Sequence, residues 1–454
     1  MTAMNRLQIS FLLSILLIPF FGIAQDSSVT YSLNEAIEYA LQHQESMQLA
    51  DLDIQSAEKD IKATLADGLP QINGSGRLTR NFNFRSNFGP GGTGFFSQIP
   101  AGQVGSFAFG VPYEGDISAN ATQLLFNASY FIGLKASKTY KELAKRQKKQ
   151  SEIEVVANVS KAYYGVLIAE ERLDFLNVTL NQIKDLMETT KKIYEVGLEE
   201  EINFQQVEIN YNNTLNEKQN LERVVAYSYN ILQFQMGMDL KESITLSDSI
   251  SEDVFKEKEE TAVLNYSNRV EYGLLNTTIQ LQRLNEKNFK GQYLPSLSLF
   301  GTTGAVTGGL HARDLFKTNN WFNYSLVGLS MNLPIFDGFR KSANIQKAKV
   351  EIKKLEVQRS QLEKQIDLEL AQANIAYYNS LEKLTNVRNT LTLAKSVYNS
   401  SIKKQKIGAG SQQEVLNVRS IYKEAETNYY STLYDLIIGK IDRDKAMGVL
   451  IKNE

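Results

Sequence analysis

The side chains that most often carry out chemistry are scarce in this chain of 454 residues. It has no cysteine, which excludes structural disulfides, thiolate metal sites and thiol nucleophiles. The two histidines, His43 and His311, lie far apart in the sequence, and each is more typical of a surface residue than of a metal ligand or general base. No phosphate-binding loop, nucleophile triad or catalytic carboxylate pair stands in a supporting context. The sequence therefore predicts no enzyme, no cofactor and no metal site.

The overall composition excludes two further classes of protein. The formal net charge is −2 and hydrophobic residues make up 43% of the chain, so it is neither disordered nor a polyelectrolyte. A nucleic acid is therefore not an expected partner.

Residues 1–24 are typical of a secretory signal peptide. Arg6 supplies the positive start, Phe11 to Ile18 the apolar run, and Gly22-Ile23-Ala24 a small-residue cleavage site. The alternative is an uncleaved anchor, but the apolar run is shorter than the roughly 20 residues that span a bilayer. We expect an exported chain with no further transmembrane helix.

Proline spacing predicts very long helices. No proline lies between Tyr113 and Leu294 or between Ile335 and Glu454, and an interior proline would break a helix. Residues 127–196 and 339–407 would each be roughly 105 Å long as helices, and the segments 33–65, 202–236, 261–290 and 412–447 roughly half that length. Apolar residues at heptad spacing indicate coiled-coil packing: Leu173, Leu176, Leu180, Ile183, Met187, Thr190 and Tyr194 in the first, and Leu384, Val387, Leu391, Ala394 and Tyr398 in the second.

Strand patterns are confined to short segments beside the prolines. From Val327 to Ile335 apolar residues alternate with small or polar ones, and Ile117 to Thr122 alternates similarly. With weaker alternation in 72–84 and 297–301, this predicts two β-hairpins, at about 70–126 and 295–336.

The chain also repeats itself. Leu69-Pro70-Gln71-Ile72 returns as Leu294-Pro295-Ser296-Leu297, and Gly197 returns as Gly408. We therefore predict two structural repeats, 25–237 and 261–454, joined by a connecting segment at 238–260. The predicted fold class is mainly α with a small β part, in which long antiparallel helices carry two hairpins at one end and two tight turns at the other.

Four alternating strands cannot close a barrel alone, because the smallest transmembrane barrels have about eight strands. Either several protomers share one barrel, or the strands form a small soluble domain that caps a periplasmic coiled coil. The signal peptide, the Gly-rich hairpin loops and a possible interfacial girdle of Trp321, Phe322 and Tyr324 favour the barrel.

In these features the sequence resembles the TolC-like outer membrane efflux proteins, over the whole mature chain. The resemblance rests on the duplicated pattern, the Leu-Pro strand openings at Leu69 and Leu294, and the sequence Pro334-Ile335-Phe336-Asp337-Gly338. It also rests on the turns Glu195-Val196-Gly197 and Lys406-Ile407-Gly408. It implies a homotrimer in the outer membrane, with a 12-stranded barrel continuous with a periplasmic tube of 12 helices. The trimer would be a passive exit duct for an inner-membrane transporter, joined to it by a periplasmic adaptor.

In this family the two turns far from the membrane form the constricted entrance and dock the adaptor. The resemblance places them here at about 197–203 and 408–414. Glycine suits the left-handed turn that ends a helix, and Ser411 is a plausible N-cap. The residues assigned to the turns and to adaptor docking are Gly197, Leu198, Gly408, Ala409, Gly410 and Ser411; those assigned to the pore entrance are Glu199, Glu200, Glu201, Asn203, Glu414 and Asn417.

The acidic constriction of the family is only partly present in this sequence. At the positions where members often carry carboxylates stand Asn203, Glu414 and Asn417, and the tyrosine and arginine of a polar lock are replaced by Gln405 and Gly410. We hypothesise that Glu414 faces the lumen and disfavours anions. The alternative is a carboxylate that only stabilises a helix start. Two interpretations also remain for the run from Glu199 to Glu201: it could contact a basic adaptor tip, or it could be a solvated turn.

A cationic run lies near the start of the first long helix. It could lie under anionic lipid headgroups of the outer membrane, or it could form a solvated helix face. The competing interpretation of the whole chain is a non-conducting periplasmic scaffold or adaptor built on a coiled coil. The run consists of Lys135, Lys138, Lys141, Lys145, Arg146, Lys148 and Lys149.

Overall fold

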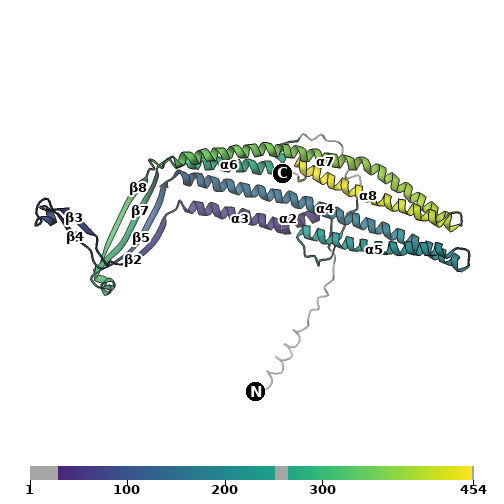
Figure 1. The fold of residues 1–454 in the computed structure, drawn as a ribbon, viewed down its shortest axis with the longest axis horizontal. Helices are drawn as coiled ribbons and strands as arrows, with labels where there is room; N and C mark the ends of the chain where they lie inside the picture. Colours follow the sequence, from purple (N-terminus) through teal and green to yellow (C-terminus); the bar gives the residue numbers. More distant parts are fainter. Residues whose placement is uncertain (1–28, 251–263, 452–454) are drawn as a thin grey trace, which may run out of the picture. The chain divides into compact units, whose positions relative to one another are not determined.

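The computed structural model describes residues 29–250 and 264–451, so the predicted signal peptide lies outside the described residues. Seven α-helices and eight strands are assigned within them (Figure 1). The helices are α2 (Leu33–His43), α3 (Glu45–Ala66), α4 (Ala128–Glu195), α5 (Glu201–Met236), α6 (Val270–Gly291), α7 (Arg340–Lys406) and α8 (Gln412–Met447). The strands are β1 (Val29–Tyr31), β2 (Gln71–Arg80), β3 (Ser86–Pro90), β4 (Val104–Ala108), β5 (Tyr113–Phe126), β6 (Ile244–Leu246), β7 (Ser296–Gly309) and β8 (Trp321–Asn332).

The two long helices form where proline is absent. Helix α4 has 68 residues and α7 has 67, which makes each roughly 100 Å long. Both begin and end within one or two residues of the predicted bounds, and α5 and α8 also match. The prediction of long helices is confirmed.

The segment 33–65 was expected to be one helix, and that expectation is wrong. Helix α2 begins with a capping box, in which Ser32 and Glu35 each accept a hydrogen bond from the other's backbone N–H. It ends at Gln44, whose extended ψ of 136° separates it from α3. The end of α5 packs against this break, because a Cβ added to Gly237 would lie 2.7 Å from the Cα of Gln44. A contact between distant segments therefore accompanies the break.

The predicted hairpins form and join into one antiparallel sheet of order β2-β5-β7-β8. The joining pair, β5 with β7, was not predicted. Gly328 leaves room for the ring of Phe300, its partner on β7, because an added Cβ would lie 2.9 Å from that ring. Strand β8 ends at Asn332, three residues before the end of the predicted alternation.

Short strands and 3-10 helices lie in the hairpin loops and the connecting segments. The loop of the first hairpin carries its own antiparallel pair, β3 with β4, whereas the second loop holds the 3-10 helices Ala312–Phe316 and Thr318–Asn320. Strand β1 pairs in parallel with β6, which lies in the predicted connecting segment. Helix α6 begins at Val270, nine residues later than expected, after a 3-10 turn at Tyr266–Asn268.

The described residues divide into two compact units. The first contains residues 29–45, 155–250 and 374–443, which include α5, most of α8 and the C-terminal parts of α4 and α7. The second contains residues 46–154, 264–373 and 444–451, which include the four-stranded sheet, α3 and α6. Within residues 29–250 and 264–451, no helix is both long and apolar enough to cross a membrane.

Candidate functional site

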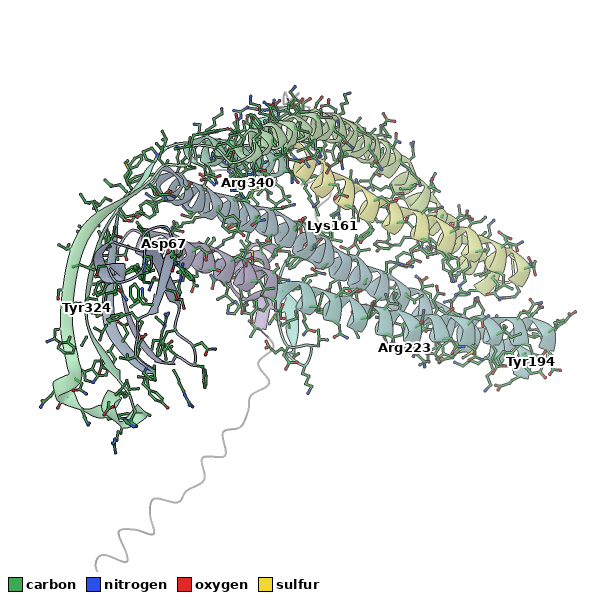
Figure 2. The ribbon with its side chains drawn as sticks, turned by 60° about the vertical axis from the view of Figure 1, so that its left-hand side comes forward. Asp67, Lys161, Tyr194, Arg223, Tyr324 and Arg340 are labelled. Atoms are coloured by element: carbon green, nitrogen blue, oxygen red, sulfur yellow. The ribbon has the colours of Figure 1, made fainter. Side chains whose placement is uncertain are left out.

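The turn between α4 and α5 reverses the chain within five residues. The N–H of Leu198 donates to the carbonyl of Ile193 at 3.0 Å, and the N–H of Gly197 donates to that of Tyr194 at 2.9 Å. This pair of bonds is the Schellman motif, which needs a left-handed residue after the helix. Gly197 supplies it, with φ of +75°. Figure 2 shows Tyr194 at this end of α4.

The turn between α7 and α8 has the same backbone design. The N–H of Ala409 donates to the carbonyl of Lys404 at 2.9 Å, and that of Gly408 to Gln405 at 3.0 Å. Gly408 has φ of +74°. A Cβ on Gly410 would lie 3.1 Å from that of Lys404, so the turn folds closely over the helix end. The predicted left-handed glycines are confirmed at both turns.

The two returning helices begin differently. Ser411 accepts the backbone N–H of Glu414 at 3.1 Å, which confirms it as the N-cap of α8. Glu200 is the N-cap of α5 but makes no side-chain cap bond. The Glu199 carboxylate instead accepts from the Asn203 amide at 2.6 Å. Of the predicted entrance residues here, Glu199 and Glu200 lie in the turn, whereas Glu201 and Asn203 lie at the start of α5. The hydrogen bond from Asn203 to Glu199 joins the turn to that helix.

Glu414 also contacts the preceding helix. The Ser401 hydroxyl of α7 donates to its carboxylate at 3.2 Å, and the Glu414 side chain is half-buried. Asn417, one turn later, is exposed and accepts from Gln413 at 3.1 Å. Glu414 is therefore tied to α7, whereas Asn417 bonds only along its own helix.

The charge at these turns is mixed. Glu200 and Glu201 are exposed beside the first turn, but the last turn of α7 carries exposed lysines. These cations complement the negative end of the α7 dipole, and they also weaken the field of the turn carboxylates. Sequence reasoning missed them, although counting back one turn from Gly408 would have found them. They are Lys403, Lys404 and Lys406.

One apolar cluster anchors both turns. It takes buried side chains from α4, α5, α7 and α8, and α5 lies beside α4 and α8 beside α7 in Figure 1. Tyr194 and Phe204, stacked at 5.8 Å, extend the packing toward the first turn. Burial of such a cluster fixes the stems of the turns relative to each other. Its members are Leu186, Val207, Ala394, Tyr398, Ile402, Val415, Tyr422 and Ala425.

Unsatisfied polar atoms flank the second turn. Gln405 and Gln412 are both buried, and among the described residues the side-chain amide oxygen of Gln405 and both polar atoms of the Gln412 side-chain amide have no hydrogen-bond partner. Such atoms destabilise a fold by about 1–3 kcal/mol each. The second turn thus has well-formed helix caps, but the glutamine side chains on either side of it lack hydrogen-bond partners.

The cationic run at the start of α4 finds partners within the second unit. Lys141 pairs with Glu58 of α3 at 2.8 Å, and Lys148 with Asp51 at 2.6 Å. Lys145 and Lys149 pair with glutamates of α4 itself. These pairs favour the solvated helix face over a lipid contact.

The two histidines have local partners. His43 stacks on Tyr39 with ring centroids 4.0 Å apart, and His311 lies 3.7 Å from Asp314 in the 3-10 turn that it caps. Across the described part of the chain, no group of three or more histidine, aspartate or glutamate side chains could hold a metal ion.

Comparison with known proteins gives consistent relatives. The chain is 22% identical over 359 residues to the outer membrane protein TolC of Vibrio cholerae, covering 76% of this chain and 79% of that protein. Its structure is similar to the Campylobacter jejuni CmeC outer membrane channel, with a TM-score of 0.71, 18% identity and coverage of 92% and 85%. It is also similar to the outer membrane protein VceC of Vibrio cholerae, with a TM-score of 0.69, 14% identity and coverage of 92% and 96%.

The structural likenesses establish the shared fold, and the family model decides the membership. The model described as outer membrane efflux protein matches residues 36–238 and 290–448, which is more than half of the chain. The resemblance seen in the sequence is thereby confirmed. The chain belongs to the outer membrane efflux protein family, whose members are transport channels of the outer membrane and not enzymes.

Proposed function

We propose that three copies of this chain form a passive duct that carries cargo from an inner-membrane transporter across the periplasm and the outer membrane. The observation that carries the proposal is the open sheet, in which β2 and β8 are the outer strands. Hydrocarbon tolerates no open edge, and four strands cannot close on themselves. Pairing of β8 with β2 of the next copy would close three sets of four strands into one barrel.

The two faces of the sheet support a barrel with a lipid side and a water side. Val327, Leu329 and Met331 point to one face of β8 and are exposed by 77%, 65% and 67%. On the opposite face, Thr302 donates to Asn120 at 2.8 Å. The first face suits lipid and the second suits a wet lumen.

The α4–α5 and α7–α8 turns are proposed as the entrance and the adaptor-docking surface. They lie in the same unit, and their short backbone connections present exposed side chains such as Leu198 and Ile407, which are exposed by 81% and 80%. Val196 and Ile202 beside the first turn are also exposed, and apolar side chains gathered in this way suit a surface that a partner covers. A periplasmic adaptor held there would connect the duct to its transporter.

Electron microscopy of the detergent-purified protein tests the architecture. We expect a hollow particle with threefold symmetry, and conductance when it is inserted into a planar bilayer. A solid rod or a dimer without a lumen would contradict the duct and support the non-conducting scaffold instead.

Ion selectivity tests the role proposed for Glu414. In the Glu414→Gln variant the cation-to-anion permeability ratio should fall, because a fixed negative charge leaves the narrow entrance. Glu424→Gln, at an exposed position of the same helix, is the matched control. Equal selectivity in the wild type and both variants would leave Glu414 with the helix-start role alone.

A further inference from the structure

Helix α8 turns charged side chains toward α4 and α5. Arg419 is half-buried and donates to the hydroxyl of Thr214 on α5, which in turn donates to the carbonyl of Asn210 at 2.7 Å. Glu426, two turns further along α8, is only 7% exposed. One face of α8 therefore inserts both signs of charge between the helices.

The two charges differ in how they are satisfied. Arg419 has its hydrogen bond to Thr214, but among the described residues Glu426 has neither a hydrogen-bond nor an ion-pair partner. Arg172 of α4 faces Glu426, yet its buried Nε also lacks a partner. An ionised carboxylate in this position keeps only a small part of its water and gains no ion pair in return, which is unfavourable.

The surroundings of Glu426 do not compensate for its burial. Desolvation raises the pKa of its carboxyl to about 7, although Arg172 and Lys423 oppose the shift. Lys423 is already engaged with Glu217 of α5 at 2.8 Å, and Glu217 raises the pKa further. The other titratable groups around the site are Glu171 and Asp174 on α4, Tyr398 on α7, and Tyr422 and Tyr430 on α8.

The contact between α5 and α8 is polar as well. A groove of about 550 Å³ runs between these helices, lined by polar side chains that include Asn213 and Ser420. No member of the apolar cluster lines this groove. A contact made of polar groups separates more easily than an apolar one, because the exposed groups are hydrated when it opens.

We propose that the contact of α8 with α4 and α5 is a proton-controlled seam, which neutral Glu426 keeps closed and ionised Glu426 loosens. The sign follows from linkage. Glu426 holds its proton more tightly in the closed seam than in water, where a glutamate has a pKa of about 4.5. The equilibrium constant for separation of the seam therefore rises about tenfold for each pH unit between about 4.5 and 7. Above that range it no longer changes with pH.

The seam lies on the helix that leaves the α7–α8 turn, so its state bears on the turn. In the closed state α8 is held at Thr214 and along the groove, and also by buried apolar side chains that include Tyr422 and Ala425 of the apolar cluster. A loosened seam loses the polar part of this contact. If the chain acts as the proposed duct, acid would tighten its entrance and neutral pH would loosen it. The seam itself does not depend on conduction.

Hydrogen–deuterium exchange of the full-length protein in detergent tests the seam without requiring a channel. After correction for intrinsic exchange, the opening equilibrium constant of α8 peptides covering 419–430 should rise at least tenfold from pH 5 to pH 8 in the wild type. Glu426→Gln mimics the neutral form, so it should keep these peptides protected at both pH values. Glu424→Gln, at an exposed neighbour, should behave like the wild type.

A second variant locates the titrating group. Arg172→Gln removes the cation that lowers the pKa of Glu426, so the midpoint of the pH response should move upward. Exchange that does not change with pH in the wild type, or a response that persists in Glu426→Gln, would overturn the proposal. A conducting trimer whose seam does not respond to pH would overturn this inference and leave the proposed duct unaffected. A pH-dependent seam in a protein that does not conduct would support this inference and contradict the duct.

Discussion

The α4–α5 and α7–α8 turns share a backbone and differ in the side chains that hold it. Both close with a Schellman motif, and the glycines that follow the helices have nearly equal φ values, +75° at Gly197 and +74° at Gly408. The side-chain hydrogen bonds around the two turns differ. In the first turn, Glu199 accepts a hydrogen bond from Asn203 at the start of the following helix, α5.

The second turn is tied to the helix before it. Ser411 caps α8, and Ser401 reaches from α7 to Glu414 on the far side of the turn. The side-chain hydrogen bond of the first turn reaches the helix after it, whereas that of Glu414 reaches the helix before it, so we expect only the second turn to be coupled to its preceding helix by a hydrogen bond. The comparison indicates that backbone geometry sets where the chain reverses, and that side-chain bonds set what the turn moves with.

The largest expected effect tests the part that the turns share. Gly197→Ala and Gly408→Ala should each destabilise the protein by about 1–2 kcal/mol, because an L-residue is strained in the left-handed region. No atom lies within 4 Å of an added Cβ at either position, so backbone strain is the only expected cause. Urea unfolding followed by circular dichroism measures both.

Gly133→Ala is the matched control for these two variants. Gly133 lies inside α4 and also has open space around an added Cβ, so alanine there should stabilise by up to about 1 kcal/mol. Clearly unequal losses at Gly197 and Gly408 would show that the turns do not share one backbone design.

The second prediction separates the helix starts. Ser411→Ala removes the cap of α8 and should destabilise by about 1 kcal/mol. Glu200→Ala occupies the equivalent position of α5, where no side-chain cap exists, and should change stability by less than about 0.5 kcal/mol. Losses of the same size at both positions would remove the distinction between the turns.

Local signals in the sequence were sufficient for much of this fold. Absence of proline and heptad spacing predicted α4 and α7, because helix formation depends on each residue and its near neighbours. Gly197, Gly408 and Ser411 were predictable for the same reason, since caps are formed within a few residues.

Contacts between distant segments were not predictable from such signals. The break at Gln44 coincides with the close approach of Gly237, and the two hairpins join through β5 and β7, whose pairing depends on the whole sheet. At the turns, sequence reasoning placed Glu414 but not its partner Ser401, which lies thirteen residues earlier on another helix. Periodicity carries no information about which side chains meet across a turn.

The smallest expected effect concerns that partner. Ser401→Ala should destabilise by about 0.5–1 kcal/mol, the usual contribution of one hydrogen bond, and Ser400→Ala should have less effect because its exposed hydroxyl only bonds back to Ser396. A double-mutant cycle with Glu414→Gln isolates the interaction, because two residues in contact are non-additive. A coupling energy near zero would mean that Glu414 is not held by α7. The second turn would then move as independently as the first, and a charge at position 414 would follow the turn instead of the stem.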